Sequence, residues 1–144
     1  MRQEKPIMHG LKVIHEDNHL IAINKPVGAL VHGDETGDET LADAVKQYIK
    51  LRYNKPGDVF LGVIHRLDRP VSGVVIFART SKALVRMNKM LQEKTISKKY
   101  LAIVSIRPEE LEGTLTHHLT KDESKNIVKA KKKKKPGSKE ATLK

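Results

Sequence analysis

The residues best suited to chemistry lie in one short stretch, HRLDRPVSG at residues 65–73. In it a single carboxylate, Asp68, stands between two guanidinium groups, those of Arg66 and Arg69. Neighbouring positive charges favour the ionised form of a carboxyl group, and an ionised, positioned carboxylate can serve as a nucleophile or as a general base. A salt-bridged turn with no chemical role would use the same residue types, because ion pairs are common in loops.

Apolar stretches on both sides of this segment predict the strands that position it. Residues 59–64 and 73–78 are runs typical of buried strands, and Pro70 and Gly73 mark the connection between them as a loop. We therefore expect Asp68 at a strand end, held by a rigid scaffold and still reachable from solvent.

Two helices are predicted by their capping patterns. Thr40 is typical of an N-cap, with Asp43 at the third helical position, and Leu41, Val45 and Ile49 fall on one helical face. Ser81 is the expected cap of a second helix.

The remaining apolar stretches predict strands at residues 11–14, 20–23 and 100–106, a weaker strand at 114–119, and the start of another at 141–144. Hairpin spacing combined with two intervening helices favours an α+β fold over a regular βαβ array. We expect a mixed, mostly antiparallel sheet flanked by helices.

Length and composition narrow the classes of protein. A chain of 144 residues with 38% hydrophobic residues suits one globular domain rather than a disordered chain. Its apolar runs are far shorter than the roughly 18 residues that a membrane span needs, and its first residues lack the apolar core of a signal peptide. With no cysteine, the chain fits a reducing compartment, so we expect a cytoplasmic protein with no membrane partner.

Positive charge is concentrated near the end of the chain. The formal net charge is +11, and residues 121–144 contain ten lysines against three acidic residues. A basic protein favours polyanions, and nucleic acid is the first partner to consider. A solvated lysine-rich segment without a partner is the alternative.

Three motifs resemble those of one enzyme family. HRLDRPVSG, continuing into VVIFARTSKAL at residues 74–84, closely resembles the signature of the RluA family of RNA pseudouridine synthases. DNHLIAINKP at residues 17–26 is similar to the strand and loop that open the family's catalytic domain, and KKYLAIV at residues 98–104 resembles its tyrosine-bearing motif. The similarity extends from about residue 11 to about residue 119.

The resemblance implies isomerisation of specific uridines in structured RNA, ribosomal or transfer RNA, with no cofactor and no metal. Asp68 would be the catalytic aspartate, acting as a nucleophile or as a base on the sugar. Arg66 would pair with Asp68 and help to hold the place of the flipped nucleotide. Tyr100 would pack against the base and assist removal of the proton from carbon 5. Judged by residue type alone, a tyrosine on an apolar strand is a core residue with a hydrated hydroxyl.

Two further residues of the motifs receive structural roles. His65 is expected to shape the catalytic loop rather than act as a base, and Lys25 is expected to cap a loop. His117 and His118 are adjacent, so on a strand they face opposite sides and cannot hold one metal ion together.

The expected organisation has three parts: an N-terminal extension at residues 1–10, the catalytic domain at 11–120, and a lysine-rich segment at 121–144. The family's third motif, which supplies a basic residue and an apolar contact, has no counterpart here and would lie beyond Lys144. We therefore expect the N-terminal part of a catalytic domain. The alternative function is that of a truncated, inactive fragment that binds RNA.

Overall fold

The computed structural model describes residues 10–33, 37–122, 124 and 127–144. The chain divides into two compact units, unit 1 (Met1–Lys98) and unit 2 (Lys99–Lys144). The expected N-terminal extension lies outside the described residues except for Gly10. The boundary expected after residue 120 falls within a strand of unit 2, β5 (Leu115–Asp122).

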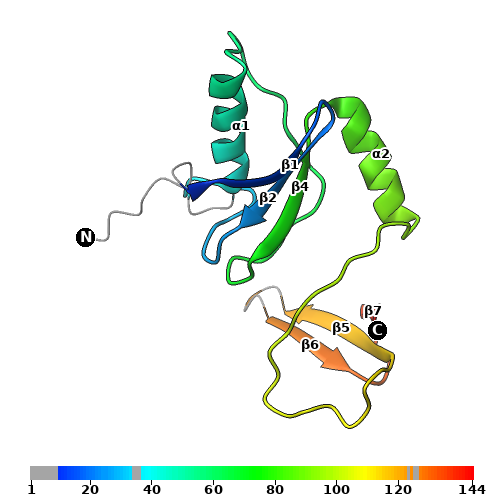
Figure 1. Cartoon of the computed structure of the whole chain (residues 1–144). Coiled ribbons are helices and arrows are strands. Elements are labelled where there is room, and N and C mark those ends of the chain that lie inside the picture. Colours follow the sequence, from blue (N-terminus) through cyan, green and yellow to red (C-terminus); the bar gives the residue numbers. More distant parts are fainter. Residues whose placement is uncertain (1–9, 34–36, 123, 125–126) are drawn as a thin grey trace. The chain divides into compact units, whose positions relative to one another are not determined.

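Unit 1 is built on a four-stranded antiparallel sheet in the order β1-β2-β4-β3. Figure 1 labels β1, β2 and β4 of this sheet. Its strands are β1 (Lys12–Glu16), β2 (Leu20–Lys25), β3 (Gly62–Val63) and β4 (Gly73–Ala78). The expected pairing of the first two strands is confirmed, with Val13 opposite Ile23. The α+β class is confirmed as well, because two helices, α1 (Leu41–Arg52) and α2 (Ser81–Gln92), accompany this sheet.

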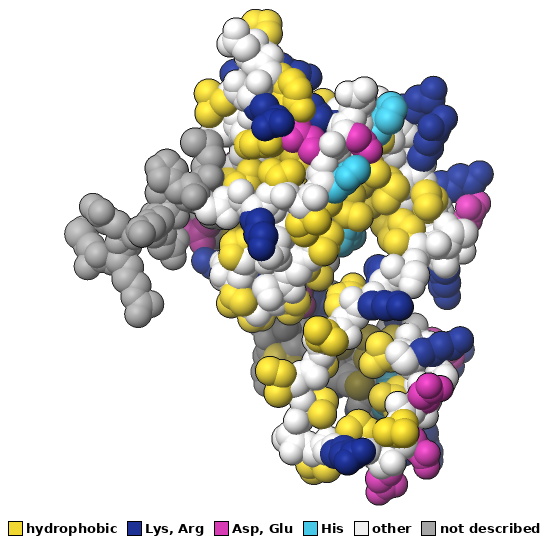
Figure 2. Space-filling model, viewed as in Figure 1, with side chains coloured by type: hydrophobic (Ala, Val, Ile, Leu, Met, Phe, Trp, Pro, Cys, Tyr) yellow, Lys and Arg dark blue, Asp and Glu magenta, His cyan; other side chains and the backbone are white. Residues whose placement is uncertain are grey.

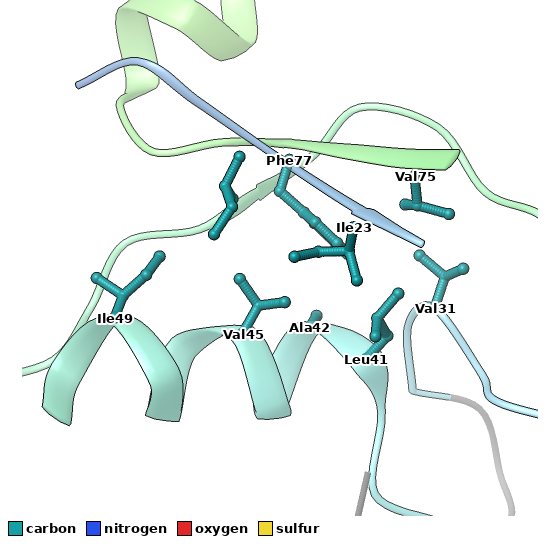
Figure 3. Close-up of a cluster of buried hydrophobic side chains, with 9 residues drawn as sticks. Ile23, Val31, Leu41, Ala42, Val45, Ile49, Val75 and Phe77 are labelled. Atoms are coloured by element: carbon teal, nitrogen blue, oxygen red, sulfur yellow. The ribbon is translucent and has the colours of Figure 1, made fainter. Parts of the chain in front are cut away.

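The main core lies between α1 and one face of this sheet (Figure 3). Alternate residues of β2 and β4 point towards the helix, and the helix presents residues three or four positions apart. Burial of one Val, Leu, Ile or Phe side chain in this core stabilises the fold by about 1.5–3 kcal/mol. The members with the lowest exposure are Ile21, Ile23, Leu41, Val45, Ile49, Val75 and Phe77.

The expected capping box of α1 is present. The Asp43 backbone N–H donates to Thr40 Oγ1 at 3.1 Å, and the Thr40 backbone N–H donates to Asp43 Oδ2 at 3.3 Å. Two N–H groups that have no intrahelical partner are thereby satisfied.

A smaller cluster packs α2 against the sheet. Its buried members are Ile64, Ala78 and Ala83, with Ile76 and Leu84 packed beside them. Ile76 and Ala78 alternate with Val75 and Phe77 along β4, so they face the side opposite the main core.

The expected cap of α2 is wrong by one residue. Thr80 is the N-cap, and its Oγ1 accepts a hydrogen bond from the Ala83 N–H at 3.1 Å. Ser81 is already the first helical residue, since Thr80 is the one with extended backbone angles.

The strand expected at residues 59–64 is much shorter than predicted. Within residues 59–64, only Gly62 and Val63 pair with β4, where they lie opposite Ala78 and Phe77. The next donor along β4, the Ile76 N–H, instead donates to Nε2 of the His65 side chain at 3.1 Å. A side chain thus takes the place of the backbone acceptor, and the strand ends.

Unit 2 is a three-stranded antiparallel sheet in the order β6-β5-β7, with β6 (Ile127–Lys131) and β7 (Lys139–Leu143) on either side of β5. The strands expected at 114–119 and from residue 141 are confirmed. Apolar side chains are open to solvent on this unit (Figure 2).

The strand expected at residues 100–106 is absent from the structure, which describes this whole segment as irregular. Leu101 and Ile103 are fully exposed, at 105% each. A strand needs a neighbour for its backbone N–H and C=O groups, and in the described part of unit 2 the sheet pairs only β5, β6 and β7.

Among the described residues, no helix has both the length and the apolar character to cross a membrane.

Candidate active site

Asp68 lies in the loop that leads from β3 to β4 and is exposed to solvent, as expected. The Val71 N–H donates to the Asp68 carbonyl oxygen at 2.9 Å, which closes a turn directly after the carboxylate. The carboxylate is therefore carried by a turn with fixed backbone and remains open to a ligand.

A buried ammonium group lies beneath this loop. Lys25, the last residue of β2, has 0% exposure. Its Nζ donates to the carbonyl oxygens of Val71 at 2.6 Å, Pro26 at 3.1 Å and Arg69 at 3.2 Å. An ammonium has three N–H donors and a buried one needs partners for them, so these three bonds satisfy it completely.

Burial lowers the pKa of Lys25 below its ordinary value, and the negative charge of Asp68 opposes this by raising it. Lys25 thus acts on the loop both through hydrogen bonds and through its charge. Lys25 does more than cap a loop, the role that was expected of it. Its side chain donates to the carbonyl oxygens of Arg69 and Val71, which lie on either side of Pro70. The signal in the sequence was its place at the end of an apolar strand, where a lysine has to find acceptors.

A second connection holds the loop to the chain segment that follows β2. The Gly28 N–H donates to the Arg69 carbonyl oxygen at 2.8 Å, and Arg69 Nε donates to the Gly28 carbonyl oxygen at 3.0 Å. Gly28 has φ +89°, a conformation that favours glycine. Arg69 Nη2 also pairs with Asp38 Oδ2 at 3.1 Å.

The contacts of Arg66 and Arg69 differ from the expected ion pairing with Asp68. Within the described part of the chain, neither Arg66 nor Arg69 forms a salt bridge with Asp68. The guanidinium of Arg69 is directed to Gly28 and Asp38, while Arg66 is exposed. The expected pairing of Arg66 with Asp68 is therefore not seen, and Arg66 remains available to a ligand.

His65 has the structural role that was expected. Its Nε2 accepts from the Ile76 N–H, which requires an unprotonated nitrogen there. Burial lowers the pKa of His65, and the charge of Lys98 lowers it further. The neutral ring thus joins the start of the Asp68 loop to β4.

Tyr100 belongs to unit 2 and is 60% exposed. It lies neither on a strand nor in a core of that unit, so the alternative of a core tyrosine is not realised there.

Among the described residues, no group of three or more His, Cys, Asp or Glu side chains could hold a metal ion. His117 and His118 are consecutive residues of β5 and face opposite sides.

The model of the family described as RNA pseudouridylate synthase matches residues 19–144. A match over most of the chain shows the family, and this chain belongs to the RNA pseudouridylate synthases. The resemblance to the RluA type is confirmed by curated relatives.

One relative, ribosomal large subunit pseudouridine synthase C of Buchnera aphidicola subsp. Acyrthosiphon pisum, is 41% identical over 93 residues, which are 65% of this chain and 28% of the relative. Another, ribosomal large subunit pseudouridine synthase D of Nitrosomonas europaea, is 36% identical over 95 residues, 65% of this chain and 27% of the relative. The matched region is therefore under a third of either relative's length.

A solved structure shares the fold. Human RNA pseudouridylate synthase domain containing 4 superposes with a TM-score of 0.74 at 21% identity, covering 94% of this chain and 54% of that one.

Proposed function

We propose that this chain supplies the catalytic aspartate of an RNA pseudouridine synthase, and that Asp68 acts on uridine in ribosomal or transfer RNA. The observation that carries the proposal is the exposed Asp68 carboxylate on a loop held by Lys25 and by the mutual hydrogen bonds of Gly28 and Arg69. A carboxylate that needs no reorganisation before it meets its substrate is what nucleophilic or general-base catalysis requires.

The reaction is an isomerisation, so its atoms balance without an oxidant, a reductant or a bound cofactor. The bond between the ribose carbon 1′ and uracil N1 breaks, a bond from carbon 1′ to carbon 5 forms, carbon 5 loses its proton and N1 gains one. Asp68 would act on the ribose either as the nucleophile or as a base. Cleavage places negative charge on the leaving uracil, and preorganised donors stabilise such charge.

The substrate uridine must leave its stack before the sugar becomes accessible, at a cost on the order of a few kcal/mol. Arg66, exposed and two residues before Asp68, would contact the RNA backbone or fill the vacated place. Tyr100 would supply the aromatic face against the base and assist removal of the proton from carbon 5. The same proposal places the protein in the cytoplasm with its RNA.

A second candidate is RNA binding without isomerisation. The lysine-rich segment 121–144 favours it, because phosphate neutralisation alone supplies affinity for RNA.

The two candidates separate in one experiment. Ribosomal RNA transcripts are incubated with the chain or with Asp68→Asn, digested, and analysed for pseudouridine by chromatography. Pseudouridine that is formed by the chain and not by Asp68→Asn supports the synthase. RNA binding without pseudouridine would overturn it in favour of the second candidate.

A further inference from the structure

Lysine side chains gather on one face of the unit 2 sheet. Lys129 and Lys131 are alternate residues of β6, so they project from the same face. The register places Thr120 and His118 of β5 beside them. Two ammonium groups therefore lie on an edge strand whose inner neighbours on this face are polar.

A tight turn brings a third lysine to this place. The Ser138 N–H donates to the Lys135 carbonyl oxygen at 3.0 Å, and the Lys135 N–H donates to Ser138 Oγ at 3.1 Å. Between them stand Pro136 and Gly137, the latter with φ +75°. Proline followed by a glycine of positive φ is the pattern of a type II turn, so the backbone of Lys135 is fixed rather than free.

The ammonium of Lys131 is close enough to Lys129 and Lys135 to be affected by both. The adjoining Lys135 side chain lowers the pKa of Lys131, and the charge of Lys129 lowers it further. Like charges repel, so such a group is most stable with an anion between its members.

No acidic side chain neutralises these lysines in the described part of the chain, because none of the three forms a salt bridge there. Glu140, on the same face, lies across β5 from Lys131, roughly 10 Å away at two strand spacings. Asp122 accepts a hydrogen bond from Ser124 Oγ at 2.7 Å.

We infer that Lys129, Lys131 and Lys135 form a binding site for backbone phosphates of RNA. Ammonium groups donate short, charge-assisted hydrogen bonds to phosphate oxygens. The site is open on an exposed face, which suits a polymer whose binding is driven by counterion release more than a small anion that needs an enclosed pocket. The inference rests on the proposed function for its RNA partner and adds where the phosphates bind.

The test compares two triple variants of the full chain. One carries Lys129→Gln, Lys131→Gln and Lys135→Gln; its matched control carries Lys46→Gln, Lys50→Gln and Lys55→Gln, the same loss of charge at exposed lysines of unit 1. Affinity for a ribosomal RNA hairpin is measured by fluorescence anisotropy from 50 to 300 mM KCl. Circular dichroism confirms that both variants stay folded.

The cluster variant is expected to lose at least tenfold in affinity at low salt, and the slope of log K against log salt should fall by about 2–3. The control should lose less than threefold. Equal losses in the two variants would overturn the inference, because then only total charge matters.

A second readout is independent of affinity. Nuclear magnetic resonance of the Lys131 side chain should show its pKa below the ordinary lysine value of 10.5, and bound RNA should raise that pKa towards the ordinary value. A pKa of Lys131 that stays lowered with RNA bound would contradict phosphate binding at Lys131. Failure of the proposed function looks different: RNA binding would depend on the cluster while no pseudouridine forms.

Discussion

The ammonium of Lys25 donates a hydrogen bond of 2.6 Å to the carbonyl oxygen of Val71, which joins the buried end of β2 to the turn that carries Asp68. The two residues are 46 positions apart in sequence. One side chain therefore couples the core of unit 1 to the position of the proposed catalytic carboxylate.

Replacing Lys25 by methionine should damage this connection. Methionine fills a similar volume but donates no hydrogen bond, so the Val71 carbonyl oxygen loses its partner at a cost of about 1–3 kcal/mol. We expect that loss in the free energy of unfolding, measured by urea denaturation, together with a lower kcat for uridine isomerisation and a smaller change in KM.

Lys12→Met is the matched control, because Lys12 is an exposed lysine on β1. It should change stability by less than about 0.5 kcal/mol. Equal effects of the two substitutions would show that the buried bonds of Lys25 are unimportant.

His65 should make the stability of unit 1 depend on pH. Its pKa in the folded chain lies below the ordinary value of 6.5 because the ring is partly removed from water. Below about pH 6.5 the unfolded chain therefore binds more protons than the folded one, and stability falls as pH falls. Thermal unfolding from pH 7.5 to 5 should show a decreasing Tm, and His65→Gln should reduce that decrease. An unchanged pH profile in the variant would contradict a neutral, partly buried His65.

The short-range features of unit 1 were predictable from its sequence. The capping box of Thr40 and Asp43 and the strand at Gly73–Ala78 depend on neighbouring residues alone. Sequence also identified the loop containing Asp68, because its motif is local.

Features that depend on distant partners were not predictable. The strand before Asp68 ends early because His65 takes the Ile76 N–H, a competition visible only when both are placed. Residues 100–106 have strand-like composition, but strand structure needs a paired neighbour. The role of Lys25 likewise needs the position of Val71, which lies far away in sequence.

The N-cap of α2 offers a direct check of one such correction. Thr80→Ala removes the oxygen that accepts from the Ala83 N–H and should destabilise unit 1 by about 1 kcal/mol. Ser81→Ala should have almost no effect, because Ser81 lies within the helix. Both free energies come from urea denaturation. The reverse order would restore Ser81 as the cap.

A polar network around Glu16 stabilises the other end of the sheet. Its carboxylate accepts from the hydroxyls of Tyr48 at 2.9 Å and Tyr53 at 2.8 Å, and it pairs with Arg79 at 3.1 Å. The side chains of Glu16 and Arg79 are each only 11% exposed. Glu16→Gln removes the charge and places an N–H₂ group against a donor, so we expect a loss of about 1–3 kcal/mol in unfolding free energy.

The control for this network is Glu93→Gln, which breaks an exposed pair with Lys89 at 3.7 Å. Exposed pairs of this kind contribute less than about 0.5 kcal/mol. A Glu16 variant as stable as the Glu93 variant would show that the network is not a stabilising one.

Tritium release from RNA labelled at carbon 5 of uridine tests the catalytic role of Asp68 directly, because isomerisation must free that hydrogen. The chain is compared with Asp68→Asn and with Asp58→Asn, a second exposed carboxylate of unit 1 outside the loop. We expect release by the chain and by Asp58→Asn, with at least a thousandfold loss of release in Asp68→Asn and an RNA affinity of that variant within threefold of the unchanged chain. Release that survives in Asp68→Asn would contradict the assignment of Asp68.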